Sequence, residues 1–454
     1  MPVLYCAEWV LPISAPPIFE GAVAVENDRI AATGKRSILS KTFSDAVIQD
    51  FGNAAIIPGL INAHSHLELT AMRGFLDRDE GEFFAWLRKL TKARLEGLTG
   101  DDLYVSAAWG ACEAARAGVT CVADASDSAR ECLTAVRNVG LRGTIFQESF
   151  GPDPRLAKEN FQKLTDKVSC LRELTTPLVG AGVSPHAPYT VCAGQLELIA
   201  EFAFTENLPL MMHAAESLAE KSLMFEGSGP FAEGLRSRGI EWRAPGFSPI
   251  EYLRRLGVLR TRPLLAHCIH VDDADLDALQ ESGTRVAHCP KSNAKLGHGC
   301  APLAEFLNRN IPVGLGSDSV ASNNTCDLLQ EAQYAILFSR VFHGSGQTRM
   351  LRAVDGLRAA TLGGARAVGR EETIGELREG LQADLAVASL DAKNQLPLYD
   401  PEGTLIFASS GRDVILTMVA GREVYRDGQI TTVDEERLRA RMNEIATKLQ
   451  RFDP

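Results

Sequence analysis

The segment "IIPGLINAHSHLELTAMRG", residues 56–74, is an apolar run that ends in two histidines, His64 and His66. Successive side chains of a β-strand point to opposite sides, so residues two apart share a face. His64 and His66 are therefore expected to face the same way from one strand. The chain has only nine histidines, so a close pair at this position indicates a site where two imidazoles act together.

Further short apolar runs follow up to residue 318, and stretches with apolar residues at helical spacing separate them. Strand and helix that alternate eight times predict a (β/α)₈ barrel of the TIM type. In order, the eight runs are IIPGLINAHSH (56–66), GVTCVADAS (118–126), GTIFQES (143–149), LVGAGVSPH (178–186), LPLMMHAAE (208–216), PLLAHC (263–268), RVAHCP (285–290) and IPVGLGSD (311–318).

The two flanks of the chain have a different pattern, in which strands alternate with tight turns. It is present in "IFEGAVAVENDRIAATG" (18–34), "GELREGLQADLAVASL" (375–390) and "VILTMVAGREVYRDGQI" (414–430). We expect the two flanks to pair with each other into one small β-sandwich.

The predicted organisation is thus a composite β-sandwich domain, residues 1–56 and 371–454, around a metal-dependent barrel, residues 57–370. A charged helix over about residues 433–451 is expected to end the chain.

Composition limits the possible partners. The net charge of −11 over 454 residues would repel a nucleic-acid backbone or an anionic membrane surface. No apolar run reaches the roughly 18 residues that a membrane-spanning helix needs, and the N-terminus lacks the basic start of a signal peptide. The ten cysteines are scattered without a CxxC pair, as is typical of reduced thiols. These features predict a cytoplasmic protein without nucleic acid or membrane as partner.

Ionisable residues stand where the apolar runs end, and in a parallel barrel the chemistry gathers at the carboxyl ends of the strands. Two inward histidines of the first strand, a third from the fifth and a carboxylate from the eighth can surround one divalent cation. Three histidines and one aspartate with an open position suit Zn²⁺, and Fe²⁺ nearly as well. The residues at these run ends are His64, His66, Glu148, His186, His213, Glu216, His267, His288 and Asp318.

Seven motifs, in order, resemble the amidohydrolase superfamily, and more narrowly its cytosine-deaminase-like and chlorohydrolase-like branch. They are "PGLINAHSHLE", "SPHAPYT", "HAAES", "LLAHCIHVDDADL", "HCPKSNAKLGHG", "GLGSDSVASNN" and "IGELREGLQADLAV". Among members of this branch, the chain resembles aminodeoxyfutalosine deaminases and deaminases of adenosine and S-adenosylhomocysteine. Many members are dimers or larger, so a homo-oligomer is possible.

The resemblance implies a role for each strand-end residue. The metal ligands would be His64, His66, His213 and Asp318. Glu216 would be the proton shuttle and His267 would hold or polarise the metal-bound hydroxide, while His186 and His288 would lie on the substrate side. The fourth strand end has no lysine, which two-metal members carry there in carboxylated form, so one metal ion is expected.

The predicted reaction is a hydrolytic deamination, in which water adds across an aromatic C=N bond and ammonia leaves. The chain would thus be an aminohydrolase acting on C–N bonds of cyclic amidines, other than peptide bonds. Asp318 would accept a proton from the metal-bound water, and Glu216 would deliver one to the ring nitrogen. The metal and His267 would stabilise the oxygen of the tetrahedral intermediate.

The motifs favour an adenine-type nucleoside as substrate, with more than one candidate. "SPHAPYT" resembles members that act on adenosine, S-adenosylhomocysteine and methylthioadenosine, whereas "HSHLELT" followed by "EFFAWL" looks closer to aminodeoxyfutalosine deaminases of the alternative menaquinone route. The prediction is therefore 6-aminodeoxyfutalosine, an adenine nucleoside that bears a benzoate. The alternatives are the other three nucleosides, a triazine or chlorohydrolase-like substrate, an amide, and a non-catalytic scaffold.

Four residues outside the strand ends are further candidates. Trp86, in "GEFFAWL", belongs either to a helix core or to a lid that stacks on a heterocycle. Glu68 is either a salt-bridged carboxylate or a substrate contact, and Arg73 is a candidate partner for a substrate carboxylate. His298, in the glycine-flanked "KLGHG", is interpreted as a solvent or substrate-edge residue.

Overall fold

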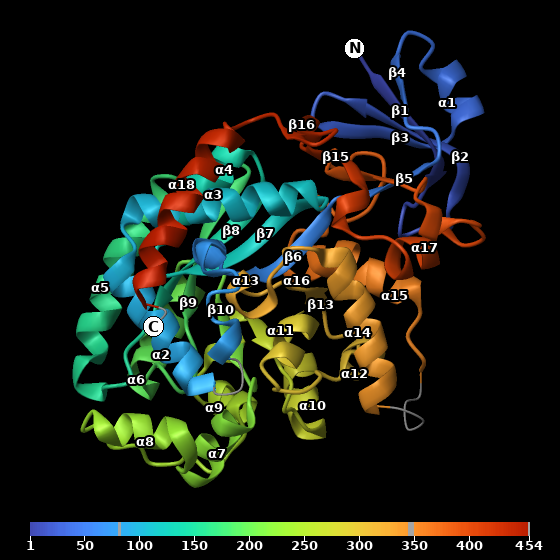
Figure 1. Cartoon of the computed structure of the whole chain (residues 1–454). Helices are drawn as coiled ribbons and strands as arrows, with labels where there is room; N and C mark the ends of the chain where they lie inside the picture. The colour runs from blue at the N-terminus through green and yellow to red at the C-terminus, as the bar shows by residue number, and fades with distance from the viewer. Residues whose placement is uncertain (80–82, 344–348, 453–454) are drawn as a thin grey trace.

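The computed structural model describes residues 1–79, 83–343 and 349–452 (Figure 1). Each of the eight predicted runs contains a β-strand. The strands are β6 (Leu60–Ser65), β7 (Val119–Ser126), β8 (Arg142–Ser149), β9 (Val179–Pro185), β10 (Met211–Ala214), β11 (Leu264–His267), β12 (Arg285–His288) and β13 (Val313–Leu315).

These strands close into one barrel. β6 to β9 form a four-stranded parallel sheet, and β10 to β13 form another. Parallel bridges between Val183 and Leu210, and between Ser65 and Asp318, join the two sheets at both seams. The predicted (β/α)₈ barrel is confirmed, and the second bridge places the carboxyl end of the first strand beside that of the eighth.

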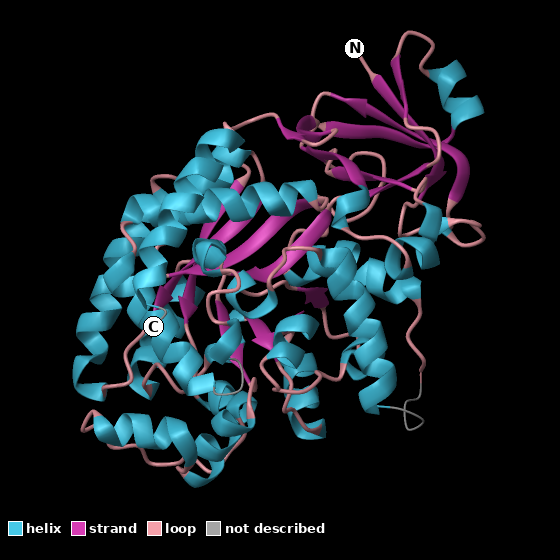
Figure 2. Ribbon diagram, in the orientation of Figure 1, coloured by secondary structure: helices cyan, strands magenta, loops and turns pink. Residues whose placement is uncertain are grey.

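Helices follow the barrel strands and cover the outside of the barrel (Figure 2). Capping residues set their ends. Thr99 caps the start of α3 and forms a capping box with Asp102, and Gly140 caps the end of α4 in the left-handed conformation. The barrel helices are α2 (Phe83–Gly97), α3 (Gly100–Arg116), α4 (Ala129–Val139), α5 (Ala157–Arg172), α6 (Ala193–Thr205), α7 (Leu218–Glu226), α8 (Gly229–Ser237), α9 (Pro249–Arg255), α10 (Asp273–Ser282), α11 (Pro290–Lys295), α12 (Leu303–Asn308), α13 (Val320–Asn323), α14 (Leu328–His343), α15 (Ala353–Arg358) and α16 (Gly364–Ala367).

The two flanks pair with each other, as the sequence predicted, and their strands form one nine-stranded sheet, mostly antiparallel. The sheet forks at β1, which pairs with β4 through Val3–Cys6 and with β5 through Trp9–Val10. Side chains of both flanks build a separate apolar core between them. The strands are β1 (Val3–Val10), β2 (Ile18–Glu26), β3 (Arg29–Lys35), β4 (Val47–Asp50), β5 (Ala54–Pro58), β14 (Leu385–Ser389), β15 (Val414–Val419), β16 (Arg422–Arg426) and β17 (Gln429–Ile430), with helices α1 (Arg36–Thr42) and α17 (Pro401–Phe407) beside them.

The flank sheet is fastened to the amino-terminal end of the barrel. Arg142, the first residue of β8, donates from Nε and a terminal nitrogen to the two carboxylate oxygens of Asp384, at 3.0 and 2.9 Å. Both side chains are buried, so a broken pair would leave a buried charge without a partner. The sheet therefore lies away from the carboxyl ends of the strands, where the ionisable residues gather.

The last helix packs on the barrel. α18 (Glu435–Leu449) begins at Asp434, whose side chain accepts from the backbone N–H of Arg437. Lys448 of α18 donates to both carboxylate oxygens of Asp102 in α3, at 2.8 Å each. No helix among the described residues has both the length and the apolar character needed to cross a membrane.

Candidate active site

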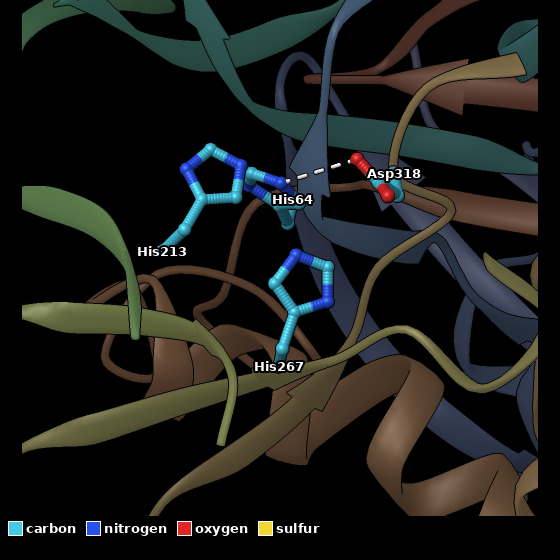
Figure 3. Close-up of side chains that lie close together, drawn as sticks. All are labelled: His64, His213, His267 and Asp318. Atoms are coloured by element: carbon cyan, nitrogen blue, oxygen red, sulfur yellow. Dashed lines mark ion pairs between the residues drawn. The ribbon is translucent and has the colours of Figure 1, made fainter. Parts of the chain in front are cut away.

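Four ionisable side chains from distant parts of the sequence meet at the carboxyl ends of the strands. His64 of β6, His213 of β10, His267 of β11 and Asp318, just after β13, are buried and offer ligand atoms that all lie within 4.8 Å of one another (Figure 3). Nε2 of His64 is 3.4 Å from Oδ1 of Asp318. We call these four residues the donor cluster.

His66 also faces this cluster. Its Nε2 is 3.3 Å from Nε2 of His213 and 3.5 Å from Oδ1 of Asp318. Both histidines of the "HSH" segment thus point to the barrel axis, as the two-residue period of a strand predicts. The expected ligands His64, His66, His213 and Asp318 are brought together, with His267 beside them.

The chemistry of the cluster fits a divalent cation. Nε2 of His64 and Nε2 of His267 are buried and make no hydrogen bond within the described part of the chain, an arrangement that costs free energy unless a ligand satisfies them. Burial lowers the pKa of His64 to about 4 and that of His213 well below its usual value. Neutral imidazoles keep a lone pair for a metal ion.

Hydrogen bonds on the far side of the rings orient them toward the centre. Nδ1 of His213 is 2.9 Å from the backbone oxygen of His186. Nδ1 of His267 is 2.8 Å from Oδ1 of Asn293. Because Nδ1 of each ring is engaged in this way, Nε2 is the atom that faces the cluster, as is usual for histidines that bind metals.

Asp318 is oriented in the same manner. Its Oδ2 accepts hydrogen bonds from Ser292 Oγ at 2.5 Å and from Ser322 Oγ at 3.2 Å, which leaves Oδ1 to face the histidines. Burial acts to raise the pKa of Asp318, but the neighbouring ring of His64 outweighs burial and lowers this pKa well below its ordinary value. The carboxyl is therefore ionised at neutral pH.

The backbone is strained where the strands leave the barrel. Ala215, His267, Cys268 and Asp318 all have a positive φ, at 53°, 74°, 45° and 57°. Residues with a β-carbon rarely adopt this conformation, and its cost is typical of functional sites. The strand ends turn sharply here, so that the side chains point to a common centre.

Glu216 lies at the edge of the donor cluster. Its Oε1 is 3.6 Å from Nε2 of His267 and 3.8 Å from Nε2 of His298. Its Oε2 accepts from the hydroxyl of Tyr189 at 3.2 Å. The backbone N–H of Glu216 donates to Oε2 of Glu220 at 2.8 Å. Sequence reasoning had placed Glu216 here but had missed Tyr189, and it had not paired His298 with this carboxylate.

A cavity of about 490 Å³ opens over the cluster, which is within the usual range for a small-molecule site. Its polar side is made of strand-end residues, including His66, His213, Glu216, His267 and Asp318. Its opposite side is made of apolar residues of α2, including Phe83, Trp86, Leu87 and Leu90, which repeat at helical spacing.

The predicted substrate contacts divide into two groups. His186, Trp86 and Glu68 line the cavity. His288 is fully buried and Arg73 pairs with Glu113, and neither belongs to the lining. Trp86 is buried as well as lining, and its ring stacks on that of Phe83 with centroids 5.9 Å apart.

The structure separates the two alternatives for Glu68. Arg94 of α2 donates to both carboxylate oxygens of Glu68 at 3.0 and 3.2 Å, and Ser126 Oγ and the backbone N–H of Ser128 donate at 2.6 and 3.1 Å. Glu68 is thus a salt-bridged carboxylate. Arg94, not Arg73, is the arginine of the lining. Trp86, Leu90 and Arg94 follow one another in steps of four residues, and this helical spacing is the signal that could have revealed Arg94.

Comparisons with known proteins agree with this geometry. The model of the amidohydrolase family matches residues 55–424. The chain belongs to the amidohydrolase family. A 5-methylthioadenosine/S-adenosylhomocysteine deaminase of Nitratidesulfovibrio vulgaris strain Hildenborough is 32% identical over 422 residues, which cover 93% of this chain and 90% of the relative.

Two further matches are also deaminases. A 5-methylthioadenosine/S-adenosylhomocysteine deaminase of Moorella thermoacetica is 31% identical over 440 residues, covering 95% and 96% of the two chains. The structure of an adenosine deaminase from Xanthomonas campestris with bound zinc superimposes with a TM-score of 0.85 at 26% identity, covering 99% of this chain and 98% of that one. This amidohydrolase is a metal-dependent hydrolase that acts on C–N bonds.

Proposed function

We propose that this amidohydrolase is a zinc-dependent deaminase of adenine nucleosides of the methylthioadenosine and S-adenosylhomocysteine type. The observation that carries the proposal is the position of Glu216, whose carboxyl lies 3.6 Å from His267 at the edge of the donor cluster and lines the same cavity. A proton carrier beside a metal-binding cluster is what the addition of water to a ring C=N bond requires.

The choice of zinc follows from the donor set. Three histidines and one aspartate, His64, His66, His213 and Asp318, match the nitrogen and oxygen ligands that zinc prefers. Bound there, zinc would act as a Lewis acid that lowers the pKa of a water molecule toward neutrality. The structural relative with bound zinc supports the same choice.

The protein's own residues then divide the proton transfers. Asp318 accepts a proton from the water through Oδ1, because Ser292 and Ser322 hold Oδ2. Glu216 delivers a proton to the ring nitrogen. The proton that Asp318 has accepted then goes to the amino group, which leaves as ammonia, and Glu216 regains a proton from the substrate hydroxyl as the C=O bond forms. His267, fixed through Nδ1 at Asn293, presents Nε2 to the attacking oxygen.

The substrate class rests on the relatives and on the cavity. Both relatives named above are called deaminases of methylthioadenosine and S-adenosylhomocysteine, and each match covers at least 90% of both chains. The aromatic and aliphatic residues of α2 in the cavity lining can pack against a purine ring or a thioether. Both features favour an adenine nucleoside with an extended 5′ group.

The aminodeoxyfutalosine prediction receives less support. The relatives favour the alternative substrates instead. Arg73, which this prediction offered as the partner of the benzoate, lies outside the lining in a pair with Glu113. The compound remains a useful member of a substrate panel, because the cavity wall is apolar and Arg94 belongs to it.

The test is ammonia release by protein of known metal content from methylthioadenosine, S-adenosylhomocysteine, adenosine and 6-aminodeoxyfutalosine. We expect turnover of at least one of the first three, and a loss of roughly 10²- to 10⁴-fold in kcat for Glu216→Gln. Glu206→Gln, which alters an exposed carboxylate paired with Arg172, is the matched control. Protein that carries about one zinc per chain and releases no ammonia from the panel would contradict the proposal.

A further inference from the structure

One carboxyl group of the cavity lining, that of Glu148, has an oxygen without a hydrogen-bond partner among the described residues. Glu148, near the end of β8, is only 6% exposed and lines the cavity, and its Oε1 makes no hydrogen bond among the described residues. Glu68, also in the lining, accepts four hydrogen bonds from Arg94, Ser126 and Ser128. A buried carboxyl without a donor costs free energy. A molecule bound in the cavity can supply the missing donor.

The nearest cation of the cavity wall does not serve Glu148. Arg94 holds Glu68 with two of its nitrogens and donates a further hydrogen bond to Ser128 Oγ at 3.1 Å. Its remaining nitrogen is 3.4 Å from Oδ2 of Asp127. In the described ranges, no lysine or arginine forms an ion pair with Glu148. The group is thus not one half of a structural salt bridge.

A second metal ion also fits poorly. Glu148, His186 and His213 offer atoms within 4.8 Å of one another. However, His213 has Nε2 in the donor cluster, 3.3 Å from His66, and Nδ1 2.9 Å from the backbone oxygen of His186. Nδ1 of His186 is in turn 2.9 Å from Thr190 Oγ1. A cation here would find one carboxylate and one ring nitrogen, fewer ligands than metal sites in proteins provide.

The substrate can supply the donor. The 6-amino group of an adenine nucleoside lies at the reacting centre, where the donor cluster and Glu216 act on it. Methylthioadenosine and S-adenosylhomocysteine carry sulfur in place of the 5′-hydroxyl. The hydrogen-bond donors that they share with adenosine, away from the reacting centre, are therefore the 2′- and 3′-hydroxyls of the ribose.

We propose that Glu148 is a specificity-determining residue that accepts hydrogen bonds from the 2′- and 3′-hydroxyls of the nucleoside ribose. This inference rests on the proposed function. The two oxygens of a carboxyl group match two neighbouring hydroxyls, each of which can donate one hydrogen bond. Glu148 lies beside His186 and His213 in the wall of the same cavity, within reach of a nucleoside whose amino group meets the donor cluster.

The test compares sugars as well as variants. Deamination of adenosine, 2′-deoxyadenosine and 3′-deoxyadenosine is measured with the zinc-loaded wild type, Glu148→Gln and the exposed control Glu206→Gln. In the wild type we expect kcat/KM to fall about 10- to 100-fold when either hydroxyl is removed, because the site is built to receive it. Glu148→Gln is expected to lower kcat/KM for adenosine by a similar factor, but to change kcat/KM for the two deoxynucleosides by less than about threefold.

Three results would overturn the inference. The wild type could treat all three nucleosides alike, which decides the matter without any variant. Glu148→Gln could lower kcat/KM equally for all three, which would indicate a general structural role. It could also lose zinc, which would indicate a metal ligand. Should Glu148→Gln fail to fold, Glu148→Asp and the wild-type comparison decide the question. A wild type that deaminates none of adenosine, methylthioadenosine and S-adenosylhomocysteine contradicts the proposed function instead.

Discussion

The two sides of the active-site cavity differ in the chemistry of their side chains. The strand-end side holds ionisable groups that hydrogen bonds orient, such as His213, His267 and Asp318. The α2 side presents the apolar residues Phe83 and Trp86 and is tied to the strand ends by the pair between Arg94 and Glu68. The strand-end side serves the reaction, which needs atoms at set distances. The α2 side serves substrate choice, because substitutions on a helix surface can alter which substrate binds without moving the reacting groups.

The largest effect should follow from a change on the strand-end side. Asp318→Asn removes both the proton acceptor and an anionic ligand, so kcat should fall roughly 10³- to 10⁴-fold. Ser292→Ala, which removes only the 2.5 Å hydrogen bond to Oδ2, should lower kcat roughly tenfold. Steady-state deamination kinetics and metal analysis check both. Equal losses in the two variants would mean that the orientation of Asp318, not its charge, is what matters.

A smaller effect should follow from detaching α2. Arg94→Met leaves Glu68 buried without its main partner and loosens the apolar wall, so KM should rise roughly 10- to 100-fold. We expect kcat and zinc content to change much less, because neither Arg94 nor Glu68 belongs to the donor cluster. Arg94→Lys keeps the charge but loses the bidentate contact, so its KM should lie between those of the wild type and Arg94→Met. A loss confined to kcat, with KM unchanged, would contradict the separation of the two sides.

The smallest effect concerns Glu220, whose carboxyl accepts a hydrogen bond from the backbone N–H of Glu216. Burial raises the pKa of Glu220 from 4.5 to about 8. The folded protein thus keeps a proton that the unfolded chain loses, and the free energy of unfolding should fall between these pH values, on the order of a few kcal/mol in all. Glu220→Gln, which still offers an acceptor to the Glu216 N–H, does not titrate.

Calorimetry at pH 5 and pH 8.5 tests this expectation. The Tm of Glu220→Gln relative to the wild type should rise by several degrees between the two pH values, whereas the exposed control Glu206→Gln should show no such trend. A Tm difference that stays constant with pH would show that Glu220 titrates alike in the folded and unfolded states.

Sequence analysis placed well the residues whose position follows from their own strand. The strand period put His64 and His66 on one face, and the polar ends of the apolar runs marked His213, His267 and Asp318 as neighbours. The structure brings these residues together. Each of these conclusions depended only on the position of a residue within its own strand and on the rule that barrel strands end at a common face.

Partners were the part that sequence analysis could not assign. Arg73 and Arg94 are both plausible as residues of the cavity, yet only Arg94 reaches the lining, because the path of the chain after β6 turns one inward and pairs the other with Glu113. Tyr189 and His298 contact Glu216 from separate loops, and no local pattern indicates which carboxylate a distant side chain will meet.

The sequence by itself determined the barrel, the paired flanks and the residues of the donor cluster, because hydrophobic period and strand-end position are local properties of the chain. Only the tertiary structure decided which carboxylates are satisfied. Glu68 and Glu148 are both glutamates near strand ends, but one accepts four hydrogen bonds while Oε1 of the other accepts none among the described residues. That difference arises because α2 brings Arg94 to Glu68 and the end of β7 supplies Ser126, whereas Glu148 lines the cavity.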